Sequence, residues 1–295
     1  VPKKLIVIGA GVIGLEMGTV WRRLGSEVEV IEFLPRILPG MDNEVADKFM
    51  KILQKQGLKF KLNHSLESVK KVDGKVMLSI KDTNTNSLKQ IDADVVLIAV
   101  GRKPNTSGLG LVELGLATDK HGFLEINNKF ETSIKNIYAI GDVIKGPMLA
   151  HKAEEDGVAA VEIINGEAGH VDYNLVPGII YTAPEVAVIG KTEEELKNDG
   201  ISYNKGVFPL TANSRAKAIG HTDGMVKILA DKSTDKILGA HMIGHEAGTV
   251  IHELSVAMGF GASSEDVARI CHGHPTVNEA IKEAALATYS KAIHS

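Results

Sequence analysis

The sequence has little of several residue types that would point to particular classes of protein. It has one cysteine in 295 residues, Cys271, which excludes an internal disulfide or a redox pair of cysteines within this stretch. Aromatic residues make up only 4%, so the core must be mostly aliphatic. The formal net charge is -4 and no basic stripe occurs, which argues against binding to nucleic acid.

Long apolar runs and targeting signals are missing as well. The longest apolar stretches, such as residues 95–100, suit a buried strand and are too short for a membrane span. Since there is no secretory signal pattern, we expect an intracellular protein. The sequence starts at Val1, directly before a predicted strand, which suggests a processed or truncated chain.

What the sequence does contain, in its first 32 residues, is a complete pattern for binding a dinucleotide. Residues 4–8 predict a buried strand, Gly9-Ala10-Gly11-Val12-Ile13-Gly14 follows at once, and residues 15–24 predict a helix. Residues 27–31 predict a second strand that leads to Glu32. Strand, G-x-G-x-x-G, helix, strand and acid, in this order, are typical of a Rossmann-like site for a nicotinamide dinucleotide.

Each position of this pattern has a physical role. Gly9 permits a tight turn, Gly11 lets a pyrophosphate approach the backbone, and Gly14 lets the helix pack on the strand. Backbone N–H groups at the helix start can then bind the phosphates. Glu32 can accept both ribose hydroxyls and repels a 2′-phosphate, so NAD is favoured over NADP. The flanking elements disfavour the alternative, a glycine-rich turn without a ligand.

Periodicity and composition divide the chain into three predicted domains. Residues 1–104 predict an α/β, Rossmann-like NAD-binding domain, in which a buried parallel strand at 94–100 ends at a ligand-binding edge. Residues 105–172 predict a central domain of short segments, with a strand within 132–140. Residues 173–295 predict an α+β interface domain with an antiparallel sheet.

Capping and turn signals place the other elements. Asp42 and Gly57 bound a predicted helix over 42–56, Asp73-Gly74 joins two strands of a hairpin, and Thr192 forms a capping box with Glu195. Residues 83–89 predict a polar loop. The remaining predicted elements are helices at 152–164, 192–198, 247–258 and 277–292, and strands at 58–62, 66–72, 75–80, 179–181, 186–189, 207–210, 225–229 and 237–243.

Two further segments carry groups that can do chemistry. Gly141-Asp142 offers a carboxylate beside a backbone with room for a polyol ligand, although this dipeptide is also a common turn. Cys271-His272-Gly273-His274-Pro275-Thr276, followed by Glu279, leaves three alternatives open. These are a metal site, which the cramped spacing disfavours, a capping box of Thr276 and Glu279, and a His274–Glu279 pair for acid/base chemistry.

Together these motifs resemble the dihydrolipoamide dehydrogenases, the flavoproteins of 2-oxo acid dehydrogenase complexes, over the whole chain. The segment His272-x-His274-Pro275-Thr276 is the most specific part of this resemblance. The other parts are residues 7–16, 99–104, 138–143, 146–153 and 212–216.

The resemblance implies a set of site residues. His274 would be the acid/base for a dithiol, with Glu279 as its partner. The FAD-contacting residues would be Asp142, Met148, Leu149, Ala150 and His151. The NAD-contacting residues would be Gly9, Ala10, Gly11, Val12, Ile13, Gly14, Leu15, Glu16, Glu32, Leu66 and Gly101.

The resemblance also implies partners and a location. It implies a homodimer in which His274 reaches the redox disulfide of the other subunit, with the C-terminal domain as the dimer interface. The partners would be dihydrolipoyl groups of a 2-oxo acid dehydrogenase complex. The location would be a bacterial cytoplasm or a mitochondrial matrix.

The sequence departs from the family in one respect. The family has an N-terminal flavin domain with its own glycine clamp and a C-x-x-x-x-C disulfide, and this sequence contains neither. We therefore expect the chain alone to lack lipoamide reductase activity and to bind FAD weakly or not at all, while NAD binding is retained. The alternatives are a glutathione-reductase-like enzyme, which Glu32 disfavours, and a non-catalytic dimeric assembly module.

Overall fold

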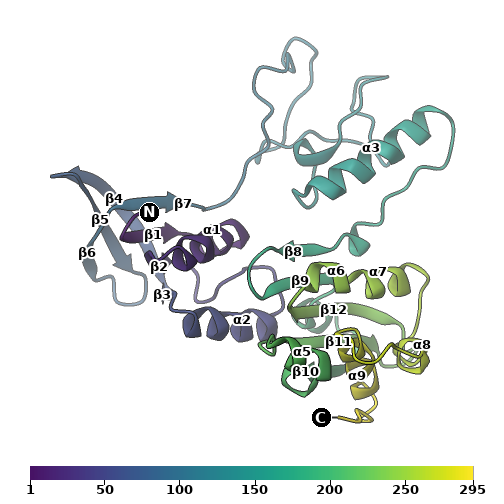
Figure 1. Cartoon of the computed structure of the whole chain (residues 1–295). Coiled ribbons are helices and arrows are strands. Elements are labelled where there is room, and N and C mark those ends of the chain that lie inside the picture. The colour runs from purple at the N-terminus through teal and green to yellow at the C-terminus, as the bar shows by residue number, and fades with distance from the viewer. Residues whose placement is uncertain (295) are drawn as a thin grey trace. The chain divides into compact units, whose positions relative to one another are not determined.

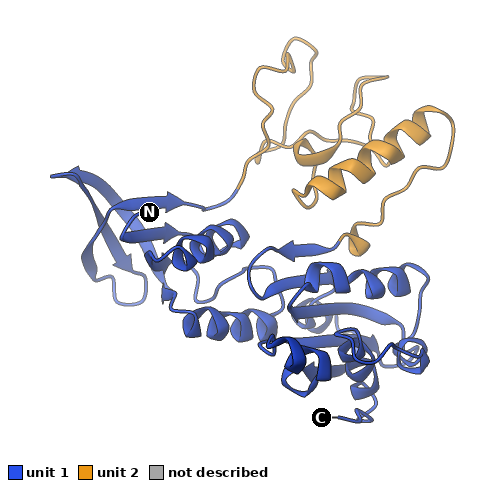
Figure 2. Ribbon diagram, in the orientation of Figure 1, with its two compact units in different colours: residues 1–101, 177–295 blue, residues 102–176 orange. Residues whose placement is uncertain are grey.

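A computed structural model describes residues 1–294, which divide into two compact units (Figures 1 and 2). Unit 1 comprises residues 1–101 and 177–295, and unit 2 comprises Arg102–Val176. The segments predicted as NAD-binding and interface domains thus share one compact unit. Among residues 1–294, we find no helix with both the length and the apolar character to cross a membrane.

Unit 1 contains the Rossmann-like fold that the sequence predicted. Its first sheet is parallel, with the strand order β3-β2-β1-β7. Two helices follow β1 and β2 in the chain. The bounds are β1 (Lys4–Ile8), β2 (Glu27–Ile31), β3 (Lys59–Lys61), β7 (Val95–Ile98), α1 (Val12–Arg23) and α2 (Asn43–Lys55).

The alternation of side chains along β1 explains how this sheet is covered. Leu5 and Val7 belong to a core with apolar residues of α1 and α2, whereas Ile6 and Ile8 belong to a second core. That second core lies against an antiparallel sheet of the order β4-β5-β6, and Asp73-Gly74 forms the predicted turn. Its bounds are β4 (His64–Val72), β5 (Lys75–Asp82) and β6 (Leu88–Ala93), so the predicted loop at 83–89 ends sooner than expected.

The prediction that residues 94–100 form a buried strand is only partly right. β7 is parallel to β1, but Val95 is 46% exposed and Ile98 is 54% exposed. The reason is the position of β7 at the edge of the sheet, where it pairs with β1 alone. An apolar run thus indicated a strand here, but burial depended on its place in the sheet.

The second part of unit 1 is the antiparallel sheet predicted for the interface domain, in the order β10-β11-β12-β9-β8. The strands are β8 (Gly178–Ile180), β9 (Glu185–Gly190), β10 (Tyr203–Pro209), β11 (Met225–Asp231) and β12 (Ile237–Gly244). Its helical segments are α4 (Glu193–Asn198), η3 (Leu210–Ala212), α5 (Ser214–Ile219), α6 (Ala247–Val250), α7 (His252–Gly259), α8 (Ser264–Arg269) and α9 (Glu279–Ala287).

Local capping signals were more reliable than helix lengths. The capping box of Thr192 and Glu195 is present at α4, as predicted. The helix predicted at 247–258 is instead divided at Ile251, and α9 is shorter than the predicted helix at 277–292. The short helices α5 and α8 were not predicted, although the capping box of Ser263 and Asp266 at α8 is a signal that the sequence contains.

Unit 2 is built around one helix. α3 (Ala150–Ile164) packs with turns and loops around a small apolar core, and η1 (Gly141–Val143) and η2 (Tyr173–Leu175) are single 3₁₀ turns. The strand predicted within 132–140 is wrong, since residues 102–176, all of them described, contain only isolated bridges. Left-handed backbone at Phe130 and Asn136 interrupts the extended chain there.

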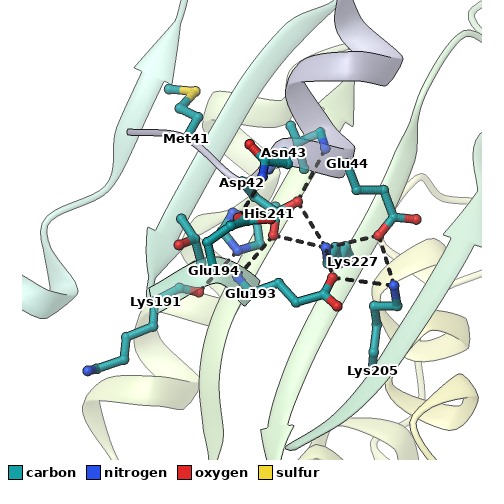
Figure 3. Close-up of polar contacts among 12 residues, drawn as sticks. Met41, Asp42, Asn43, Glu44, Lys191, Glu193, Glu194, Lys205, Lys227 and His241 are labelled. Atoms are coloured by element: carbon teal, nitrogen blue, oxygen red, sulfur yellow. Dashed lines mark hydrogen bonds and ion pairs between the residues drawn. The ribbon is translucent and has the colours of Figure 1, made fainter. Parts of the chain in front are cut away.

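A buried ion cluster joins the parallel sheet of unit 1 to its five-stranded antiparallel sheet (Figure 3). The Lys227 side chain, on β11, is fully buried, and its Nζ lies 2.9 Å from both carboxylate oxygens of Asp42. It also lies 2.6 Å from Glu193 Oε2 and 2.9 Å from Glu44 Oε2. Asp42 is the predicted N-cap of α2, and it accepts the backbone N–H groups of Val45 and Glu193.

The charges in this cluster are mutually stabilised. Burial acts to raise the pKa of Asp42 and of Glu193, but hydrogen bonds from Lys227 and other donors outweigh it, so both pKa values are lowered. Burial acts to lower the pKa of Lys227, but the carboxylates outweigh it and raise that pKa. Burial lowers the pKa of neighbouring His241, which keeps its imidazole neutral at pH 7. The cluster is therefore fully ionised at neutral pH.

We expect Lys227→Met to destabilise the protein by about 3–5 kcal/mol, because it leaves buried carboxylates without a cation. Urea denaturation measures this free energy of unfolding. The pKa values of Asp42 and Glu193 are lowered in the folded state. The wild-type cluster therefore stabilises the folded protein at pH values above the ordinary pKa range of carboxyl groups. That stabilisation is lost as the pH falls below about 4, and the variant should lose less over the same range.

Lys205→Met is the matched control for this substitution. Lys205 contacts Glu44 and Glu193 but is more exposed than Lys227, so its removal should cost less than about 1 kcal/mol. Equal losses for the two variants would contradict the role assigned to burial.

Candidate functional site

The turn between β1 and α1 has the geometry that a bound diphosphate requires. α1 begins directly after Gly11, where an added Cβ would meet no described atom within 4 Å. By contrast, a Cβ on Gly14 would lie 2.1 Å from the Gly9 carbonyl oxygen, and one on Gly9 would lie 2.3 Å from the Ala99 carbonyl oxygen. Gly9 and Gly14 are thus required by packing, whereas Gly11 leaves open space beside the uncapped helix start.

Glu32 reaches this turn from the end of β2. Its Oε2 accepts the Ala10 N–H at 2.7 Å, and its Oε1 accepts the Leu34 N–H at 2.8 Å. Each carboxylate oxygen has a second lone pair, so both can still accept a hydroxyl. The two backbone donors fix the buried carboxylate beside the glycine turn. The residues present therefore fit an adenosine ribose and diphosphate.

The other residues predicted for the NAD site have varied surroundings. Leu66 packs against the core that contains Ile8 and Ile31. Gly101 is the last residue of unit 1 before unit 2 and has a left-handed φ of 124°. Glu16 accepts the backbone N–H of Tyr181 at 2.8 Å, a contact that the sequence did not indicate. Glu16 therefore also ties α1 to the segment that follows β8.

In unit 2, the two segments predicted to contact FAD lie together. Asp142 Oδ2 accepts a hydrogen bond from Arg102 at 2.5 Å, and Arg102 also donates to the Met148 carbonyl oxygen at 3.2 Å. Leu149 is the N-cap residue of α3, Ala150 is the first helical residue, and His151 follows it. Asp142 is partly exposed, so its carboxylate can accept hydroxyl groups of a polyol and fits one end of a flavin nucleotide.

A buried ion pair that the sequence pattern did not indicate holds this turn in place. Lys152 and Asp156 have fully buried side chains 2.8 Å apart. Lys152 donates to the Gly141 carbonyl oxygen, and Asp156 accepts the Gly141 N–H, each at 3.0 Å. Tyr173 donates to Asp156 at 2.7 Å, and burial together with this bond raises the pKa of Tyr173. The backbone of Gly141, directly before Asp142, is therefore held in place on both its N–H and its carbonyl side.

The third candidate segment lies before α9. Glu279 Oε1 lies 2.9 Å from His274 Nδ1, and Glu279 Oε2 accepts the Thr276 N–H at 2.8 Å. The helix begins at Glu279, after Asn278, and the Thr276 hydroxyl donates to Gly273 instead of capping the helix. The two predicted roles of Glu279 therefore do not compete, although the Thr276 half of the capping box is wrong.

The geometry of His274 is suited to proton transfer. Its side chain is 67% exposed, and its Nε2 has no hydrogen-bond partner among residues 1–294. Burial acts to raise the pKa of Glu279, but the Thr276 N–H and His274 lower it overall, so the carboxylate is ionised at neutral pH. A cavity of about 210 Å³ lies beside this pair, lined also by Cys271, His272 and His294.

His272 and His274 have different carboxylate partners. His272 Nε2 lies 2.8 Å from Glu253 Oε1, whereas His274 pairs with Glu279. In residues 1–294 we find no group of three or more histidine, cysteine, aspartate or glutamate side chains placed to hold one metal ion.

Comparison with known families decides the family of this chain. Residues 1–157 match the family described as pyridine nucleotide-disulphide oxidoreductase, and residues 176–285 match its dimerisation domain. The chain belongs to the pyridine nucleotide-disulphide oxidoreductases. Matches to the oxidoreductase family and to its dimerisation domain thus occur in one chain.

Relatives within this family are similar over the whole chain. Dihydrolipoyl dehydrogenase 2, mitochondrial, from Arabidopsis thaliana is 58% identical over 294 residues, which is 100% of this chain and 58% of the relative. The human dihydrolipoyl dehydrogenase, mitochondrial, is 53% identical over 100% of this chain and 58% of its own length. The chain thus spans less than two thirds of these relatives.

A solved structure has the same fold as this chain. LpdA from Mycobacterium tuberculosis superposes with a TM-score of 0.88 and 27% identity, over 96% of this chain and 61% of that one. The predicted combination of a Rossmann-like domain with a dimerisation domain is therefore confirmed.

Two glycine substitutions separate binding from folding at the β1–α1 turn. We expect Gly11→Ala to leave the melting temperature nearly unchanged, because its Cβ enters open space, and to weaken NADH binding by about tenfold or more. Gly14→Ala should lower the melting temperature, because its Cβ would overlap the Gly9 carbonyl. Calorimetric titration and thermal unfolding measure the two effects. Unchanged NADH affinity in Gly11→Ala would contradict the site.

Proposed function

We propose that the whole protein is a dihydrolipoyl dehydrogenase, which oxidises dihydrolipoyl groups with NAD⁺ through a redox disulfide and FAD. The observation that carries this proposal is the His274–Glu279 pair, whose Nε2 has no partner in the described residues 1–294, on a chain that also has the glycine turn. Whole-chain identities of 53–58% to named dihydrolipoyl dehydrogenases support it.

His274 and Glu279 supply the proton chemistry of this proposal. Glu279 accepts from Nδ1 and so fixes the tautomer, which leaves Nε2 as the acceptor for a thiol proton. The ionised carboxylate then stabilises the imidazolium that forms. Oxidation of a dithiol to a disulfide releases two electrons and two protons, and His274 would accept a proton at Nε2. When bound, NAD⁺ would supply the final acceptor for both electrons and one proton, and the other proton would be released to solvent.

The cofactors of the proposal are NAD and FAD. The first turn of α1 would bind the NAD diphosphate, while Glu32 would bind the adenosine ribose through its hydroxyls. Gly9 to Glu16, Leu66 and Gly101 would complete this site. Asp142 and residues 148–151 would contact FAD, which when bound supplies the electron transfer between dithiol and nicotinamide.

The partners and the location are part of the same proposal. The match of residues 176–285 to a dimerisation domain supports a homodimer, in which His274 of one subunit serves the disulfide of the other. Lipoyl groups of a 2-oxo acid dehydrogenase complex would be the substrates. Several relatives are named as mitochondrial, which supports a mitochondrial matrix over a bacterial cytoplasm.

The 295 residues have one cysteine, so on their own they should not turn over dihydrolipoamide.

Glu32 should decide between the two nicotinamide dinucleotides. We expect the wild-type chain to bind NADH at least about tenfold more tightly than NADPH, because the carboxylate repels a 2′-phosphate. Glu32→Ala should weaken NADH binding by about tenfold and reduce this preference. Competition titrations with both dinucleotides measure this, and a wild-type preference for NADPH would refute the assignment.

His274→Gln tests the function of the whole enzyme. Loss of the acid/base group should lower kcat for dihydrolipoamide oxidation by about 10²–10⁴-fold. Affinity for NADH should stay the same, because the substitution leaves the β1–α1 turn intact. Wild-type turnover by His274→Gln would contradict the proposed chemistry.

A further inference from the structure

His274 lies in the segment from Ile270 to Asn278. A carboxylate of another helix, Glu253, contacts this segment both before and after His274. Glu253 lies in the first turn of α7. Its Oε1 is 2.8 Å from His272 Nε2, and its Oε2 accepts from Asn278 Nδ2 at 2.6 Å. We propose that Glu253 is a positioning residue that fixes His274 for proton transfer by holding this segment both before and after it. The role in proton transfer rests on the proposed function, whereas the positioning of the segment rests on these two contacts.

The anchors of Glu253 differ from the His274–Glu279 pair in their exposure. The His272 side chain is 6% exposed, so its bond to Glu253 is shielded from water. The His274 side chain is 67% exposed, and an ion pair this open to solvent contributes little to stability by itself. Glu279 alone is therefore too weak to hold the imidazole in one orientation, unless the backbone on both sides is already fixed.

The other contacts of the segment come from α9 and from Asn213, the N-cap residue of α5. Lys282 donates to the Ile270 carbonyl oxygen and Asn213 Nδ2 donates to the Thr276 carbonyl oxygen, each at 3.0 Å. The Lys282 contact fixes the backbone only before His274, and the Asn213 contact fixes it only after His274. Among residues 1–294, Glu253 is the side chain with hydrogen bonds to side chains on both sides of His274.

The residues next to His274 show why anchors on both sides matter. Gly273 precedes it and offers no side chain for a contact, so the position of His272 sets where the chain enters the site. Pro275 follows it and restricts its backbone to extended conformations. With His272 and Asn278 held by one carboxylate, the intervening residues have little freedom, and His274 Nδ1 stays within reach of Glu279.

The tautomer of His274 tests this inference without an activity assay. In the full protein with ¹⁵N-labelled histidine, NMR at neutral pH measures the ratio of Nδ1–H to Nε2–H tautomers. We expect Glu253→Ala to lower that ratio for His274 by about twofold to fivefold. Asn278→Ala cuts one contact and should have a smaller effect, while Glu253→Gln keeps one acceptor oxygen and should restore part of the ratio.

Two controls define the range of the measurement. Glu279→Ala removes the direct partner and gives the largest change. Glu265→Ala removes an exposed carboxylate of α8 that pairs with Arg269, and it should leave His274 unchanged. Melting curves of every variant confirm that it is folded.

A wild-type His274 tautomer ratio in folded Glu253→Ala would overturn the inference. If Glu253→Ala does not fold, Asn278→Ala decides, and a wild-type ratio in that variant has the same consequence. Failure of the wild-type enzyme to oxidise dihydrolipoamide would instead refute the proposed function and leave the tautomer result standing. The two failures are thus distinguishable.

Discussion

The buried cation of Lys227 is the interaction on which unit 1 depends. It lies between Asp42, which caps a helix of the parallel sheet, and Glu193, which begins a helix beside the antiparallel sheet (Figure 3). A shared apolar core, in which Phe49 of α2 and Val186 of β9 both take part, surrounds the same junction. Burial of the cluster makes each charge costly without the others, so the two sheets are held in one arrangement. The dinucleotide turn and His274 therefore lie in the same compact unit.

Two of the three candidate carboxylates, Glu32 and Glu279, are oriented by backbone N–H groups. Glu32 accepts two backbone N–H groups beside the glycine turn, and Glu279 accepts one beside His274. Each is held at a fixed place but retains acceptor capacity for another group. Asp142 differs, because the backbone before it is fixed by the buried pair of Lys152 and Asp156. In each case, preorganisation comes from contacts made before any ligand binds.

The parts of the structure that could be predicted from sequence depend on local contacts. The turn at Gly9 to Gly14 and the Thr192 capping box involve residues a few positions apart, and both are present as expected. The Asp42 cap was predicted, but its bond to Lys227, 185 positions away, has no local signal. The same is true of the contact between Glu253 and His272.

Burial of a strand and continuity of an extended segment are likewise set by the fold. The edge position that exposes Val95 follows from which strands pair, which an apolar run does not encode.

Native-state hydrogen exchange with increasing NADH is the most direct test of whether the Lys227 cluster holds the two sheets of that junction as one body. If unit 1 opens as one body, amides of β1 and of β11 will gain equal protection as the ligand binds. Protection confined to β1 and β2, or no added protection anywhere, would contradict it.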